Sequence, residues 1–210
     1  MSDAVPPGAS RADFDSLIPW ARRLLAAGKS TGAVMRAIYG TDMPPELYVL
    51  DRVYPHQLPL PVEPMFHPWQ LLALADPAAT VREPDPWARE QEERAFALDP
   101  DFVPLLKLGE PSARHGGQVI GYHLAELRKG RTTILGHAGD LPPGTDTALD
   151  KLGPSLLDVL HEWLSDHLGS APAPSEPGVL SALGVERVAE LLRGIEVLQQ
   201  EVAILEARTL

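Results

Sequence analysis

Apolar residues near the N-terminus recur at spacings of three and four, the period of a helix with one buried face. Pro19 fits only a first helical turn, so the first predicted helix begins near Asp15 or Ser16. Ser30 or Thr31 is expected to cap a second, shorter helix that ends at Gly40. The apolar positions of the two helices are Phe14, Leu17, Ile18, Ala21, Leu24 and Leu25, followed by Val34, Met35 and Ile38.

A sharp corner and a third helix are predicted by "MPPELYVL", residues 43–50. Pro44 and Pro45 fit a first turn, where no backbone N–H is needed, and Glu46 places a carboxylate near the positive end of the helix dipole. Residues 55–68 carry five prolines and are expected to form an extended loop or a sheet edge. The run "WQLLALA" that follows favours a short helix.

Farther along, the pattern changes to that of strands. "FVPLLKLG" at 102–109, "GQVIGYHLAEL" at 117–127 and "RTTILGHAG" at 131–139 are rich in β-branched and aromatic residues, the second up to His123. Lys129-Gly130 is expected to form a hairpin turn between the last two strands. Three successive strands with short connections predict an antiparallel sheet. The helical period then returns in "PSLLDVLHEWLSDHL", where Ser155 and Asp158 resemble a capping box.

The C-terminal part carries a heptad pattern after the proline-rich segment 169–178, which is predicted to be a linker. Gly194 weakens the predicted helix by up to about 1 kcal/mol relative to alanine. Two interpretations stay open: the helix folds back on its own domain, or residues 185–208 pair between chains in a homo-oligomer. The heptad positions are Val188, Leu191, Ile195, Leu198, Val202 and Leu205.

Together these elements predict an α+β fold, an antiparallel sheet flanked by N-terminal helices and a closing helix, with a separate C-terminal heptad helix. The predicted organisation is a flexible tail at 1–12, an α+β domain at 13–168, the linker at 169–178 and the terminal helix at 179–210.

Charge narrows the classes of partner. The 210-residue chain has a net charge of −11, which disfavours general nucleic-acid binding and anionic membrane surfaces and suits a basic protein. There is no cysteine, no secretory signal at the start and no apolar run near the length of a membrane span, so we expect a cytoplasmic protein. The acidic stretch around 83–101 is the candidate surface, with Glu83, Asp85, Trp87, Glu90, Glu92, Glu93, Asp99 and Asp101.

Catalytic signals are weak. His161 and Glu162 lack the second histidine of a zinc-protease helix, because Ser165 stands four residues on. No nucleophile elbow or phosphate-binding glycine loop occurs. His123 and His137 lie on neighbouring predicted strands and are the remaining candidates for a hydrolase, although a structural role is favoured. We therefore expect no catalytic residues, no metal and no cofactor.

The order of elements resembles the SUKH superfamily, bacterial immunity proteins related to a fungal cell-wall-synthesis regulator. "MPPELY" looks like the family's leucine-proline-x-x-tyrosine helix start, and "FVPLLKLG", "GGQVIGYHL", "TTILGHAG" and "GPSLLDVLHEWL" occupy the places of its strands and closing helix. The resemblance covers roughly residues 32–168. It implies a non-catalytic α+β domain that binds and neutralises a cognate toxin. A self-associating scaffold or adaptor that works through the C-terminal helix is the alternative.

Overall fold

The structure is a computed structural model, and it describes residues 14–54, 56–65, 67–75, 86–109, 116–139, 148–169 and 179–209. The predicted tail at 1–12 and nearly all of the predicted linker lie outside these ranges. Within them the helices are α1 (Phe14–Ala26), α2 (Thr31–Tyr39), α3 (Pro45–Val53), α4 (His67–Ala73), α5 (Pro86–Leu98), α6 (Leu124–Leu127), α7 (Leu156–Gly169) and α8 (Val179–Thr209). The strands are β1 (Val62–Pro64), β2 (Phe102–Leu108), β3 (Gln118–His123), β4 (Ile134–Ala138) and β5 (Asp150–Gly153).

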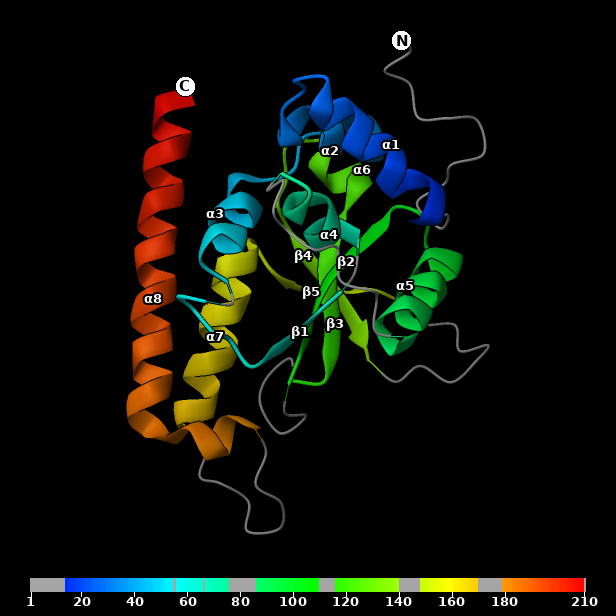
Figure 1. The fold of residues 1–210 in the computed structure, drawn as a ribbon. Helices are drawn as coiled ribbons and strands as arrows, with labels where there is room; N and C mark the ends of the chain where they lie inside the picture. Colours follow the sequence, from blue (N-terminus) through cyan, green and yellow to red (C-terminus); the bar gives the residue numbers. More distant parts are fainter. Residues whose placement is uncertain are drawn as a thin grey trace. The chain divides into compact units, whose positions relative to one another are not determined.

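The strands form one antiparallel sheet whose spatial order, β1-β2-β3-β4-β5, is also their order along the chain. The predicted α+β class is therefore confirmed (Figure 1). The pairing of β4 with β5 has an irregularity between Ile134 and Leu135. Its partners are Ile134 with Gly153, Leu135 with Lys151, and Gly136 with Asp150.

The chain divides into two compact units, each assembled from three separate segments. The first unit comprises Met1–Met43, Pro64–Leu105 and Tyr122–Arg131. The second comprises Pro44–Glu63, Leu106–Gly121 and Thr132–Leu210. In the first unit α1, α2 and α4 pack together, and in the second α7 packs on α3, α8 and β5.

The N-terminal helices follow most of their sequence signals, although α1 begins at Phe14 and so places Pro19 inside the helix and not in its first turn. Ser30 is the N-cap of α2 and its hydroxyl accepts a hydrogen bond from the Ala33 amide at 3.2 Å. Gly40 ends that helix with φ of 70°, a left-handed conformation that glycine adopts without strain. In α1 the apolar face is buried, with Leu17, Ala21 and Leu24 at most 5% exposed.

Several connections differ from the sequence prediction. No two-residue hairpin joins β3 to β4: the helical turn α6 intervenes, and Gly130 ends it with φ of 73° and an amide bond to the Leu127 carbonyl. The proline-rich segment does supply a sheet edge, the three-residue strand β1. Strand β5 and the full length of α5 were not predicted, because short or polar-faced elements carry little periodic signal.

Two side-chain systems fix the N-terminus of α7. Ser155 Oγ accepts a hydrogen bond from the Asp158 amide at 3.2 Å and donates one to the Asp158 carboxylate at 2.6 Å. The second system is the buried Glu46 carboxylate of α3, which accepts bonds from the amides of Leu156 at 3.0 Å and Leu157 at 3.3 Å. Glu46 stands in the first turn of α3, as expected, and its oxygens also satisfy first-turn donors of a helix 110 residues away.

Helix α8 is interrupted at Gly184, whose φ of 73° and ψ of 156° are not helical. Beyond this break, α8 runs alongside α7 (Figure 1) and packs on both α3 and α7. It thus belongs to the same compact unit as α7. The reason is the apolar seam: Val188, Leu191, Ile195 and Leu198 are each at most 5% exposed.

The heptad seam is therefore covered by the chain itself over these four positions, which is the fold-back interpretation. Val202 is half-buried, and Leu205 is 36% exposed. Gly194 has a packing role here, since a Cβ at this position would lie 2.5 Å from Cδ1 of Leu58. Pairing between chains through residues 185–208 stays a prediction.

Candidate functional site

The predicted acidic surface centres on α5 and the turn that follows it. Glu83 and Asp85 lie outside the described residues. Glu90 and Glu93 are exposed on α5, Trp87 is half-buried, and Asp99 and Asp101 are partly exposed. The structure thus brings most of the candidate residues into the first unit, with α5 at their centre.

Glu92 is the exception, and its prediction as a surface residue is corrected. The side chain is 6% exposed because α5 buries the stripe formed by Ala88, Gln91, Glu92 and Ala95. Its carboxylate accepts a hydrogen bond from the His67 backbone amide at 2.8 Å and also contacts His67 Nδ1. Glu92 therefore holds the first turn of α4 against α5.

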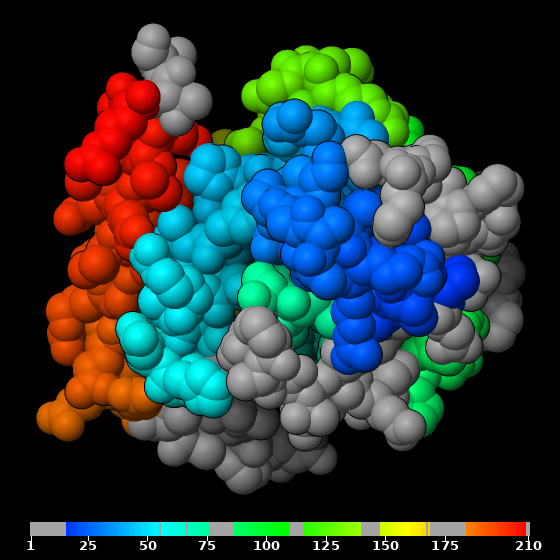
Figure 2. All heavy atoms as spheres, turned by 45° about the horizontal axis from the view of Figure 1, so that its top comes forward, coloured from blue at the N-terminus to red at the C-terminus, as the bar shows by residue number. Residues whose placement is uncertain are grey.

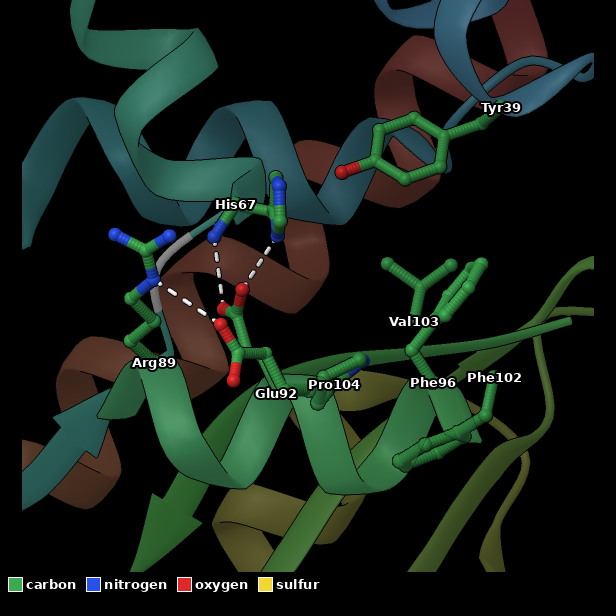
Figure 3. Close-up of a pocket in the computed structure, with 9 residues that line it drawn as sticks. Tyr39, His67, Arg89, Glu92, Phe96, Phe102, Val103 and Pro104 are labelled. Carbon is green, nitrogen blue, oxygen red and sulfur yellow. Dashed lines mark hydrogen bonds and ion pairs between the residues drawn. The ribbon is translucent and has the colours of Figure 1, made fainter. Parts of the chain in front are cut away.

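A small pocket opens beside this pair, between α5 and the beginning of β2. Its volume is about 30 Å³. Figure 3 shows the aromatic rings and Pro104 around it, with the Tyr39 hydroxyl directed toward the pocket. Because a water needs at least about 10–15 Å³, the space matches one or two waters or the tip of one side chain. The lining residues are Tyr39, His67, Arg89, Glu92, Glu93, Phe96, Phe102, Val103 and Pro104.

Helix α5 carries two ion pairs between successive turns, of which Arg89–Glu93 lines the pocket. Arg89 Nε lies 3.1 Å from Glu93 Oε1, and Arg94 pairs with Glu90. Exposed pairs of this spacing are worth about 0.3–0.5 kcal/mol each. They therefore open at little cost when another charged group approaches.

Near the end of α5, Asp99 and His123 form a further pair. Asp99 Oδ2 lies 3.0 Å from His123 Nε2, while Asp99 Oδ1 accepts a hydrogen bond from the Asp101 amide at 2.9 Å. The Asp101 carboxylate lies 3.4 Å from Arg128 Nη1. Asp99 thus holds the turn that leads into β2, and Asp101 faces a cation at the surface.

The second histidine of the hydrolase hypothesis, His137, has a different setting. It is 3% exposed and belongs to the second unit, whereas His123 belongs to the first. Burial lowers the pKa of His137, and the Ala138 carbonyl, 2.8 Å from Nδ1, opposes that shift. His123 Nε2 contacts the Asp99 carboxylate, and His137 Nδ1 contacts the Ala138 carbonyl.

Two features are absent from the described residues. No three His, Asp or Glu side chains there form a group suited to hold a metal ion. In the same part of the chain, none of the helices combines the length and apolarity needed to cross a bilayer.

Sequence signals pointed to the acidic residues of this site and missed its apolar part. Phe96 and Pro104 could have been noted as apolar residues, but nothing in the sequence indicates that α5 and the beginning of β2 line one pocket. Tyr39 and His67 come from distant segments. Comparison of the chain with protein-family models, with curated proteins and with solved structures finds no match.

Proposed function

We propose that this chain is a non-catalytic protein-binding domain of the immunity type, akin to the SUKH superfamily, which acts in the cytoplasm and neutralises a basic toxin domain. The observation that carries the proposal is the face of α5: a small pocket lined by aromatic side chains, with the exposed Arg89–Glu93 ion pair at the pocket and the Glu90–Arg94 pair on the same helix.

The apolar part of this face has the anatomy of an interface centre. Phe96 and Pro104 are half-buried in the pocket wall, and Leu98 at the end of α5 is 46% exposed. Protein interfaces bury an apolar, often aromatic centre within a polar rim, and a few anchor side chains carry most of the binding energy. A pocket of about 30 Å³ suits one such anchor better than a small-molecule substrate, since ligand sites are typically about 300–1,000 Å³.

The charged part supports a basic partner. Glu90 and Glu93 are exposed, and their pairs with Arg94 and Arg89 exchange readily for a cation of the partner. The net charge of −11 would steer a basic protein toward the chain over a distance of about 10 Å at ordinary salt. Rim charges of this kind act mainly on the association rate.

The proposal expects a toxin reading frame directly upstream of the gene. The test is co-expression with that toxin, followed by binding measurements with a catalytically inactive form of it. We expect growth rescue by the wild-type chain, and at least about ten-fold weaker binding for Phe96→Ala combined with Glu93→Lys. Glu186→Lys, at an exposed position of α8, is the matched charge control and should bind within about two-fold of wild type. Continued killing while folded chain is present would overturn the proposal.

Self-association is a second candidate because the solvent-facing side of α8 carries apolar residues. Val197 is 60% exposed and Ile204 is 53% exposed, and their seven-residue spacing places them on one face. A Val197→Glu, Ile204→Glu variant should then be monomeric where the wild type is an oligomer in sedimentation analysis. A wild-type chain that is monomeric at high concentration would rule this candidate out.

A further inference from the structure

A second surface lies in the other unit, at the groove where α8 passes the N-termini of α3 and α7. Its volume is about 330 Å³, and all of its lining residues belong to the second unit. Figure 2 shows α8, in orange to red, beside the cyan segment that carries α3. The groove is lined by Pro44, Pro45, Glu46, Thr132, Pro154, Ser155, Leu157, Asp158, Gln199, Val202, Ala203 and Glu206.

The charged side chains of this lining have one sign. They are the carboxylates of Glu46, Asp158 and Glu206, and the lining contains no Lys, Arg or His. The N-terminus of α7 contributes roughly half a positive charge, which does not cancel three negative ones. The groove is therefore a negative concavity, and a cation is the complementary occupant.

The three carboxylates differ in how many of their hydrogen-bond acceptor sites are unused. Glu46 binds two amides of α7, and Asp158 accepts bonds from Ser155 Oγ and from Gln199 Nε2 at 2.7 Å. Glu206 is exposed and makes no hydrogen bond or ion pair with any described residue. Since a carboxylate has about four acceptor sites, Glu206 keeps its full capacity and Asp158 part of its own.

The walls of the groove fit the stem of a long basic side chain. Pro45 and Val202 supply apolar surface, and the short side chain of Ala203 fills little of the groove. Lysine and arginine bury their methylene stems on such surface while the charged end stays near water or a carboxylate. Beyond the groove, Ile204 is 53% exposed and offers an apolar contact to a neighbouring residue of the same segment.

We propose that this groove docks a segment of a partner protein that carries an arginine or lysine beside an apolar residue. The basic side chain lies along Val202 and Pro45 with its charged end at Glu206 and Asp158. This surface is distinct from the α5 face, because none of its residues belongs to the first unit.

The test uses a defined probe, the peptide acetyl-Ala-Leu-Arg-Ala-Leu-amide, titrated into the ¹⁵N-labelled full chain and followed by amide chemical shifts. A twin peptide with citrulline in place of arginine has the same shape and no charge. We expect shifts at residues 155–158 and 202–206, and affinity at least about ten-fold lower for the citrulline peptide.

Variants then locate the contact. Glu206→Gln should weaken the arginine peptide at least about five-fold, and Ala203→Arg, which puts a guanidinium into the groove, should abolish the shifts. Glu186→Gln removes one exposed charge from the same helix away from the groove and should stay within about two-fold. The inference would be overturned by equal binding of the two peptides or by a Glu206→Gln variant that binds as the wild type does. It would also be overturned by shifts spread over the surface, or by no shift at about 1 mM peptide. None of these results bears on the α5 face, which is tested by its own variants.

Discussion

Replacing Glu46 tests how the second unit is held together. The carboxylate is 3% exposed and accepts two amide hydrogen bonds, at 3.0 and 3.3 Å, from the first turn of α7. Hydrogen bonds to a charged acceptor are worth roughly 1.5–3 kcal/mol, and a negative group at a helix N-terminus up to about 2 kcal/mol. These contributions overlap, because the same contacts produce both. We therefore expect Glu46→Ala to lower the free energy of unfolding by about 2–4 kcal/mol, since two buried N–H groups lose their acceptor.

Glu46→Gln separates charge from hydrogen bonding. Glutamine keeps one acceptor oxygen and removes the charge, so we expect a loss of about 1–2 kcal/mol. The measurement is urea unfolding followed by far-UV circular dichroism and by the fluorescence of the four tryptophans, among them Trp163, a fully buried residue of α7. Glu186→Ala, at an exposed site, is the control and should change stability by less than about 0.5 kcal/mol. If Glu46→Ala also falls within that range at an unchanged urea dependence, the capping role is refuted.

Substitutions at three further positions should change the stability of the chain in a defined direction. Burial raises the pKa of Asp51 to about 6 from 3.8, so between those pH values the folded state binds more protons than the unfolded state and stability falls as pH rises. Asp51→Asn should remove that trend in pH-dependent unfolding and stabilise the chain at pH 7 by on the order of 1 kcal/mol, and an unchanged pH profile would contradict this. Gly139→Ala should cost about 1–3 kcal/mol in urea unfolding, because its Cβ would lie 2.5 Å from the Gly117 carbonyl oxygen, and a neutral result would refute that close approach. Ile195→Ala, at a fully buried position, should lower the free energy of unfolding by about 2–5 kcal/mol, whereas Ile204→Ala should change it by less than about 0.5 kcal/mol; a neutral Ile195→Ala would refute the fold-back packing of the seam.

The elements that the sequence predicted well are those whose signals are local. Helix α7 combines an apolar stripe with a capping residue at Ser155, and α2 has its cap at Ser30 and its stop at Gly40. Such signals depend only on residues within one or two turns, so no tertiary information is needed. The α+β class followed because three strands carried β-branched and aromatic residues in succession.

The predictions that failed concern residues whose positions depend on contacts between distant segments. Helix α5 buries Gln91 and Glu92, so its inner face looks polar, and Glu92 was assigned to the surface. Its partner His67 is 25 residues away, as Glu46 is 110 residues from Leu156. A buried carboxylate is stable only with such partners, and sequence periodicity does not reveal them. The apolar half of the α5 face was missed for the same reason.

Each unit is assembled from three separate stretches of chain, and this limits how its binding surfaces can be mapped with deletion fragments. Neither unit corresponds to a continuous fragment, so cutting the chain after any residue from 44 to 130 would leave both incomplete. A shortened chain that ends before α8 would also uncover the apolar surfaces of α3 and α7 and invite aggregation. Loss of binding in such deletions would report misfolding, and single substitutions on the intact chain are the informative route.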